Sequence, residues 1–302
     1  MKKGVVYAGS CYIAWGLLPF FWKALHNVPA LEIVAHRIVW SLLVVLGLLA
    51  YRHQWHWLGA ALRNRRIMLT YATSACMLTV NWLVYIWAVN AGYVVETSLG
   101  YFINPLVSVL LGVLFLRERL RLGQVLALAV ACCGVGYLTL SYGRIPWIAL
   151  TIAGSFGIYG LLRKTAALES LEGLTLETLL LFLPALVYLV YLTWVGHAAL
   201  GHGPVLTNAL LVLAGVVTAI PLLLFAAGAR LISMTTLGIL QFVNPTLQFF
   251  LGVFVYHEAL SSSQLVGFAF IWVALVLYLI EGRFAGRRIG SRPRTHEAVP
   301  IK

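Results

Sequence analysis

The chain has 302 residues, of which 62% are hydrophobic and only 10% are charged, with a mean hydropathy of +0.93. Roughly a quarter of the residues in a soluble globular domain are charged, so this composition excludes that class. The 21 Lys and Arg residues outnumber nine acidic residues, all of them Glu, which could suggest a nucleic-acid partner. The basic residues instead lie in short gaps between apolar runs, as in membrane loops, so no nucleic acid is expected.

Ten apolar segments are each long enough to cross a bilayer, which takes about 20 residues in a helix. In chain order they cover residues 5–22, 31–50, 68–89, 93–116, 123–140, 145–162, 174–195, 207–227, 231–256 and 263–280. The first resembles a signal peptide, because Lys2 and Lys3 precede an apolar stretch. We interpret it as an uncleaved first helix, since its removal would leave an odd number of spans. The predicted fold is therefore an all-α membrane protein with ten transmembrane helices.

Basic residues are unevenly divided between the two sides of this topology. The side with both chain ends holds 18 of the 21, and the other holds only Lys23, Arg37 and Arg144. Since basic loops stay in the cytoplasm, both termini are expected there. The basic tail 282–302 is expected to keep this orientation near anionic lipid.

The two halves of the chain share a motif at a shift of 140 residues. Identical pairs join Phe102, Asn104, Pro105, Leu111, Gly112, Val113, Glu118, Leu120, Gln124 and Ala129 to Phe242, Asn244, Pro245, Leu251, Gly252, Val253, Glu258, Leu260, Gln264 and Ala269. Such self-similarity indicates two repeats, 1–140 and 145–281, of five helices each. Because five is odd, the second repeat must be inverted in the membrane, as is typical of secondary transporters.

The repeated Asn-Pro pairs interrupt two apolar segments near their middle. Asn104 lies about 16 Å and Asn244 about 20 Å from the start of its segment at 1.5 Å per residue. Proline removes a backbone donor, and polar backbone at such depth must be buried in protein or line a cavity. Either pair alone is compatible with a plain structural kink. Together with Gln241, one turn before Pro245, they favour a central binding site or hinge.

The second segment carries three polar residues in its outer turns. Glu32 and His36 share one helix face, and Arg37 points about 100° away from His36. A charge at this depth, about 9 Å from the helix start, normally faces the protein interior or a water-filled route. Arg37 could therefore hold a substrate carboxylate or phosphate, with Glu32 or His36 as a gate or proton site. A structural Glu32–Arg37 ion pair is the alternative.

Aromatic residues with polar tips also lie inside the spans. In the third segment Asn81 and Tyr85 share a face that Trp82 flanks. Together with Trp15, Tyr101 and Tyr159 they are candidates to line an aromatic cavity for a flat or cationic group. Each of them taken alone fits ordinary packing equally well.

Four further acidic residues in or beside the apolar segments fall into two groups. Glu96 begins the fourth segment, and Glu177 mirrors Glu32 at the other end of the inverted repeat, so both are gate or proton-coupling candidates. Glu118 and Glu258 close the repeated motif at membrane edges, where we expect a structural role beside Arg117, Arg119 or His257.

The sequence contains none of the common motifs for enzyme catalysis. The sequence lacks a P-loop, H-E-x-x-H, G-x-S-x-G and any Asp. The four cysteines (Cys11, Cys76, Cys132 and Cys133) lie in apolar runs without a C-x-x-C pair. We therefore expect no enzyme activity, no cofactor and no metal.

Five stretches, VPALEIVAHRIVWS (28–41), NWLVYIWAVN (81–90), ETSLGYFINPL (96–106), LGVLFLRER (111–119) and FAFIWVAL (268–275), resemble the RarD branch of the EamA-type drug/metabolite transporters. The resemblance covers about residues 4 to 281 and implies a ten-helix permease of the bacterial inner membrane made of two inverted EamA repeats. It also implies efflux of a drug or metabolite and leaves the substrate open.

The sequence thus predicts a secondary transporter that works by alternating access. Its expected partners are a small molecule, the lipid bilayer and, for coupling, a proton or another ion. We favour an amino-acid-like or amine zwitterion as cargo, because Arg37 suits an anionic group and the aromatic residues suit a flat ring or soft cation. A lipid-linked flippase and a non-transporting scaffold or receptor are the alternatives.

Overall fold

The computed structural model describes residues 2–53, 55–91, 93–143, 145–255 and 262–290. Within these ranges the chain is helical throughout, with short connections and no strand. The helices are α1 (Lys2–Lys23), α2 (Ala30–Arg52), α3 (His56–Arg63), α4 (Arg65–Asn90), α5 (Val94–Leu116), α6 (Leu122–Tyr142), α7 (Trp147–Thr165), α8 (Ser170–Trp194), α9 (Val205–Leu231), α10 (Met234–Gln241), α11 (Val243–Phe250), the π-helix η1 (Leu251–Val255) and α12 (Ser262–Gly290).

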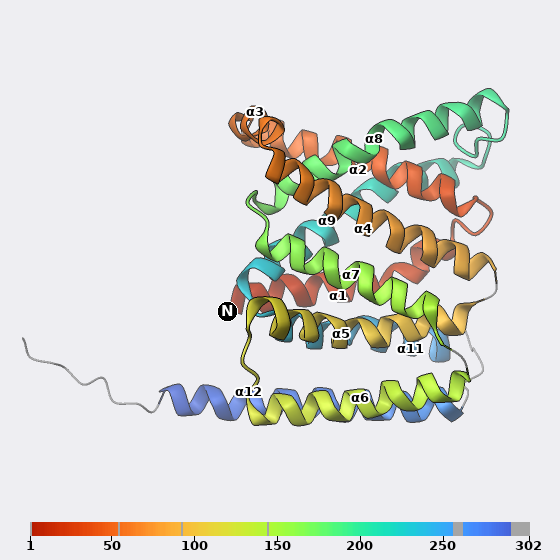
Figure 1. The fold of residues 1–302 in the computed structure, drawn as a ribbon. Coiled ribbons are helices and arrows are strands. Elements are labelled where there is room, and N and C mark those ends of the chain that lie inside the picture. The colour runs from red at the N-terminus through yellow and green to blue at the C-terminus, as the bar shows by residue number, and fades with distance from the viewer. Residues whose placement is uncertain (1, 54, 92, 144, 256–261, 291–302) are drawn as a thin grey trace, which may run out of the picture.

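The predicted spans correspond to these helices. Eight described stretches are long and apolar enough to cross a membrane, and the apolar helix Leu265–Glu281 within α12 is somewhat shorter. The remaining segment, α7, has 19 residues and lies among these helices (Figure 1). The amphipathic helix α3, with Trp57 and Ala61 buried, occupies the 52–66 connection that the sequence left without structure.

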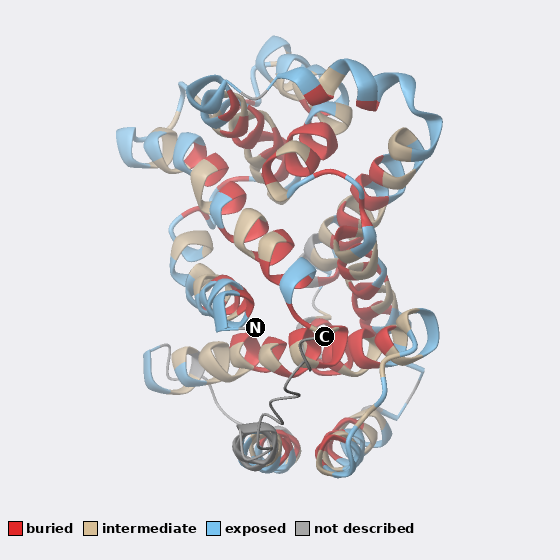
Figure 2. Cartoon of the chain, turned by 90° about the vertical axis from the view of Figure 1, so that its left-hand side faces the viewer, coloured by how far each residue is buried: buried red, intermediate tan, exposed pale blue. Residues whose placement is uncertain are grey.

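The helices form a bundle whose buried faces point inward (Figure 2). The pair α6 and α12 forms a separate layer beside it, and α5 and α11 lie between this pair and the rest (Figure 1). Helix α1 begins and α12 ends on the same side, which we call the N-terminal face, and the other side is the opposite face (Figure 1). An even number of crossings accounts for this arrangement.

The packing repeats with two-fold pseudosymmetry between the halves. Helix α1 packs on α9 and α11, and its counterpart α7 packs on α4 and α5. A Cβ on Gly16 would lie 2.8 Å from Leu247, and one on Gly157 would lie 2.7 Å from Val107. Val107 and Leu247 are 140 residues apart, which is the shift of the repeated motif. Small residues therefore allow equivalent close helix contacts in both inverted halves.

The two Asn-Pro sites differ, although the sequence predicts matching interruptions. Helix α5 runs without a break through Pro105, whereas the second copy breaks at Phe242, which ends α10 and precedes α11. The two segments cross where a Cβ on Gly238 would lie 2.7 Å from the Pro105 carbonyl oxygen. A proline costs one helical hydrogen bond, which neighbouring helices can compensate in a membrane protein, so it need not break the helix.

Candidate functional site

The guanidinium of Arg37 lies between two indole rings inside the bundle. Its Cζ is 4.8 Å from the ring centroid of Trp22 on α1 and 4.2 Å from that of Trp82 on α4. The Arg37 Nε donates a 2.9 Å hydrogen bond to the Thr218 hydroxyl on α9. Among the residues that the structure describes, Arg37 has no carboxylate partner within salt-bridge distance. Four helices thus converge on one half-buried cation.

Two tyrosines complete this group. The rings of Tyr85 on α4 and Tyr101 on α5 are edge to face with centroids 5.7 Å apart. Both lie close enough to Arg37 to interact with it electrostatically. The structure therefore brings together four residues that the sequence proposed as binding residues, namely Arg37, Trp82, Tyr85 and Tyr101. We call them, with Trp22 and Thr218, the Arg37 cluster.

The structure does not form the ion pair between Glu32 and Arg37 that was the alternative. The fully buried Glu32 accepts a 2.6 Å hydrogen bond from the backbone N–H of Ala199, and its Oε1 lies 3.8 Å from His36 Nε2. Residues five apart on an α-helix are separated by about 140°, so Glu32 and Arg37 point in different directions. The Trp40 Nε1–H donates to His36 Nδ1 at 3.3 Å, which fixes that ring.

Trp15 and Tyr159 belong to a second aromatic group instead of the Arg37 cluster. Phe225 on α9 lies 5.6 Å from both of their ring centroids and stacks on Tyr159 at an interplanar angle of 17°. Phe156 lies 5.5 Å from Trp15. Because Tyr159 is fully buried, these rings form a core contact between α1, α7 and α9. The single aromatic cavity expected from the sequence is thus divided in two.

Asn81 and Glu96 connect the first half to α7. The Asn81 amide donates to the Ile152 carbonyl at 2.8 Å and to the Ser155 hydroxyl at 3.3 Å. The Glu96 carboxylate accepts a 2.8 Å hydrogen bond from the N–H of Ile148 in the first turn of α7. Buried polar groups with such partners hold helices together, as capping carboxylates do at helix N-termini.

The Asn-Pro residues are buried near the crossing of α5 with α10 and α11. The Asn104 Oδ1 has no hydrogen-bond partner in the described part of the chain, whereas Asn244 Oδ1 accepts from the Gln248 amide at 2.9 Å. The Gln241 Oε1 accepts a long 3.5 Å contact from the Ser108 hydroxyl. A buried amide oxygen without a partner costs free energy, so Asn104 is the polar group of this region that packing does not explain.

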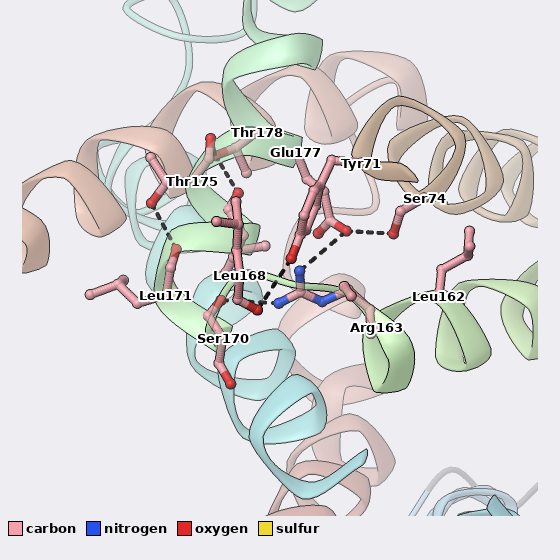
Figure 3. A network of polar contacts seen from close by, with 12 residues as sticks. Tyr71, Ser74, Leu162, Arg163, Leu168, Ser170, Leu171, Thr175, Glu177 and Thr178 are labelled. Atoms are coloured by element: carbon pink, nitrogen blue, oxygen red, sulfur yellow. Dashed lines mark hydrogen bonds and ion pairs between the residues drawn. The ribbon is translucent and has the colours of Figure 1, made fainter. Parts of the chain in front are cut away.

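A polar network closes the bundle near the N-terminal face. The Ser74 hydroxyl on α4 donates a 2.5 Å hydrogen bond to Glu177 Oε1 on α8, and Arg163 Nη1 on α7 lies 3.6 Å from the same oxygen. Arg163 also donates to the Ser170 carbonyl at 3.0 Å and lies over the ring of Tyr71. Figure 3 shows Ser74 and Arg163 reaching Glu177 from two different helices. All the side chains that meet here are buried.

Arg163, Ser74 and Thr218, like Trp22 and Tyr71, were not identified as site residues from the sequence. Arg163 was counted as a loop cation, because it precedes Lys164 at the end of a span. Ser74 and Thr218 stand alone in apolar runs, where such residues commonly bond only to their own helix. The position of Glu177 on α8 was the available signal that a buried cation should lie nearby. Glu258, the expected counterpart of Glu118, lies outside the described residues.

The fold and these groups define a class of protein: a polytopic membrane transporter built from two inverted helical halves with polar groups buried between them. The EamA-like transporter family model matches residues 2–140. The chain belongs to this family and, within it, to the RarD branch of the drug/metabolite transporters.

Relatives match almost the whole chain. An uncharacterized transporter, YojE, of Bacillus subtilis is 47% identical, over 92% of this chain and 93% of its own. Protein RarD of Streptomyces exfoliatus is 45% identical, over 99% and 94%, and protein RarD of Escherichia coli is 41% identical, over 95% and 97%. A solved crystal structure with 18% identity has the same fold, with a TM-score of 0.69 over 94% of this chain and 99% of that chain.

Proposed function

We propose that the chain exports a small organic zwitterion, of amino-acid or amine type, across the bacterial inner membrane by alternating access. The observation that carries this proposal is Arg37, a cation inside a membrane span whose described neighbours include no carboxylate. A charge buried in a membrane helix costs at least about 2.5 kcal/mol at the bilayer centre, and such residues mark substrate routes. An anionic group on the cargo would supply the missing countercharge.

The residues around Arg37 suit such a cargo. A guanidinium binds a carboxylate through two parallel hydrogen bonds, and among the described residues only Thr218 accepts a hydrogen bond from Arg37, at its Nε. The indole of Trp82 and the rings of Tyr85 and Tyr101 offer faces that attract a soft cation. The anionic group of a zwitterion would therefore pair with Arg37 and its cationic group would lie against the aromatic rings, so no buried charge would be left unpaired.

Alternating access requires closures on both sides of this site. At the opposite face, Glu32 accepts from the Ala199 backbone before α9, and His36 lies beside Glu32. Toward the N-terminal face, Glu177 joins Ser74 and Arg163. The Glu32–Ala199 and Ser74–Glu177 contacts link one half to the other, so each must break when that side opens. Glu32, His36 and Glu177 are in our proposal the gates and the candidates for proton coupling, while Glu96 acts as a helix cap.

The direction and orientation rest on separate grounds. The excess of basic residues on the side of α1's start supports a cytoplasmic location for both termini under the positive-inside rule. Export follows from the likeness to RarD-type proteins. Neither rests on the geometry of the Arg37 cluster.

Uptake into proteoliposomes tests the proposal. The purified chain is reconstituted, and the entry of radiolabelled amino acids and amines is measured with and without a pH gradient. We expect gradient-dependent uptake of at least one zwitterion, lost in Arg37→Gln. Uptake of neutral compounds alone, unchanged in Arg37→Gln, would contradict the substrate class.

A further inference from the structure

An apolar groove of about 160 Å³ opens between α2, α4 and α8 beside the Arg37 cluster. Ala35 on α2 and Ala185 on α8 form part of its lining, and Leu31 and Leu83 at its rim are 48% and 38% exposed. The Thr79 hydroxyl, a polar group in the lining, donates to the carbonyl of Ala75 on its own helix. In a membrane-spanning bundle such a groove faces hydrocarbon.

The indole of Trp82 contacts both the residues that line this groove and Arg37. Trp82 packs against the cluster formed by Val34, Ala35, Ile38 and Ala185, and all four of these residues line the groove. Its ring also lies 4.2 Å from the Arg37 guanidinium carbon. Helix α2 is also joined to α9, because the Ser41 hydroxyl donates a 3.0 Å hydrogen bond to the Gly215 carbonyl. The Trp82 indole therefore connects the groove to the Arg37 guanidinium.

The size of the groove limits what can fill it. An apolar protein cavity of about 150 Å³ binds benzene, so 160 Å³ has room for one ring or a short branched chain. The long tails of a membrane lipid or a lipid-linked carrier are too large for it. The lining is almost entirely apolar, so the groove favours an apolar group.

We propose that the groove receives the apolar arm of the transported molecule, about one ring in size, from the hydrocarbon phase while its anionic group binds Arg37. Trp82 is the partition that turns aside when the molecule enters. This inference rests on the proposed function, because it takes Arg37 as the anion site. The substrate class is thereby narrowed to amphipathic zwitterions with one compact apolar arm.

The test compares two probes with the same zwitterionic head, phenylalanine and alanine. Ala185→Phe fills the groove, and Leu183→Phe on the same helix, 66% exposed and absent from the groove lining, is the matched control. We expect Ala185→Phe to raise the KM for phenylalanine uptake by about tenfold or more and that for alanine by less than about twofold. Leu183→Phe should resemble the parent for both probes.

Equal effects of Ala185→Phe on both probes, or none on phenylalanine, would overturn the groove as a binding site. If Arg37→Gln abolishes uptake of both probes in that case, the anion site stands and only the groove fails. If Arg37→Gln changes neither, the proposed function itself is wrong. Uptake of neither probe by the parent would contradict both.

A second measurement does not depend on transport. Cys76, Cys132 and Cys133 are replaced by Ser, and a nitroxide label is attached at Ala185→Cys. We expect strong line broadening by apolar oxygen and little by a water-soluble nickel complex. A label that neither reagent reaches would show that the groove is closed to the bilayer and would overturn the proposal.

Discussion

Glu118 and Thr235, 117 residues apart in the chain, are joined by two hydrogen bonds. The Glu118 Oε2 accepts from the Thr235 backbone N–H at 2.9 Å and from its hydroxyl at 2.7 Å, while Oε1 accepts from the Met234 N–H at 2.6 Å. The carboxylate thereby satisfies the free N–H groups in the first turn of α10. One side chain at the end of α5 thus holds a helix of the other half.

The same relationship recurs at the other buried carboxylates. Glu32 contacts the segment before α9, Glu96 contacts the first turn of α7, and Glu177 contacts α4. Each of these contacts joins one repeat to the other. In a chain with only nine acidic residues, these four carboxylates therefore all connect the two halves.

The cap at Glu118 predicts a loss of stability. Glu118→Ala should destabilise the protein by about 1–2 kcal/mol, because it leaves N–H groups of α10 without acceptors and removes a negative charge from a helix N-terminus. Thermal unfolding in detergent measures the effect. Glu169→Ala, which removes an exposed cap confined to α8, is the control and should lower the melting temperature less. Equal losses of melting temperature in the two variants would show that the hydrogen bonds between the halves add no stability beyond that of an ordinary helix cap.

The ion pair of Glu177 with Arg163 predicts a dependence between two substitutions. Glu177→Gln should cost about 3–5 kcal/mol, because it leaves the buried guanidinium without a countercharge. Adding Arg163→Met to Glu177→Gln should recover part of this stability, since no unpaired charge then remains. Denaturation of the single and double variants forms a cycle. Strictly additive losses would mean that the two groups do not interact.

The sequence predicts the helices well and their contacts poorly, for one physical reason. Uninterrupted apolar runs reveal spans, and polar residues such as Arg37 reveal that some face is protected from lipid. Lipid tails are as apolar as the protein core, so hydrophobic periodicity does not tell which face meets which neighbour. Thr218 and Trp22, which contact Arg37, therefore have no signature, and Trp15 was assigned to the wrong aromatic group.

The Asn-Pro motif shows the same limit. The repeat predicts two polar interruptions near the membrane midplane that are buried or line a cavity, and the structure has Asn104 and Asn244 buried. It does not predict that α5 stays continuous while α10 and α11 separate. Whether a proline breaks a helix depends on what surrounds the freed carbonyl, which local sequence does not specify.

The unpartnered Asn104 oxygen predicts a separation of stability from activity. Asn104→Leu should fold with unchanged or slightly higher stability, because it removes a buried polar atom that lacks a partner. We expect its transport rate to fall, since that oxygen is free to serve the cargo or the moving helix. Uptake and thermal unfolding are measured on the same preparation. Asn244→Leu, which loses the bond to Gln248, should lose some stability as well.

Full transport by Asn104→Leu would reduce Asn104 to a packing residue. A large loss of stability would indicate a partner that the side chain acquires in another conformation. Either result would contradict a free polar group in this conformation that acts in transport.

The orientation predicts opposite results from two reporters. Gly201 lies in the loop before α9 at the opposite face, and residue 290 ends α12 on the side where α1 begins (Figure 1). An alkaline-phosphatase and fluorescent-protein fusion pair should report Gly201 outside and residue 290 inside. The same side for both sites would contradict the inverted-repeat topology.

The central claim, that Arg37 holds an anionic group of the cargo, is tested most directly by ligand-induced thermal stabilisation. Amino acids, amines and neutral antibiotics are screened against the parent, Arg37→Lys and Arg37→Gln. We predict that zwitterions stabilise the parent, stabilise Arg37→Lys less because a lysine cannot bind a carboxylate through a planar fork, and have no effect on Arg37→Gln. Stabilisation by neutral compounds alone, to the same extent in all three proteins, would contradict the claim.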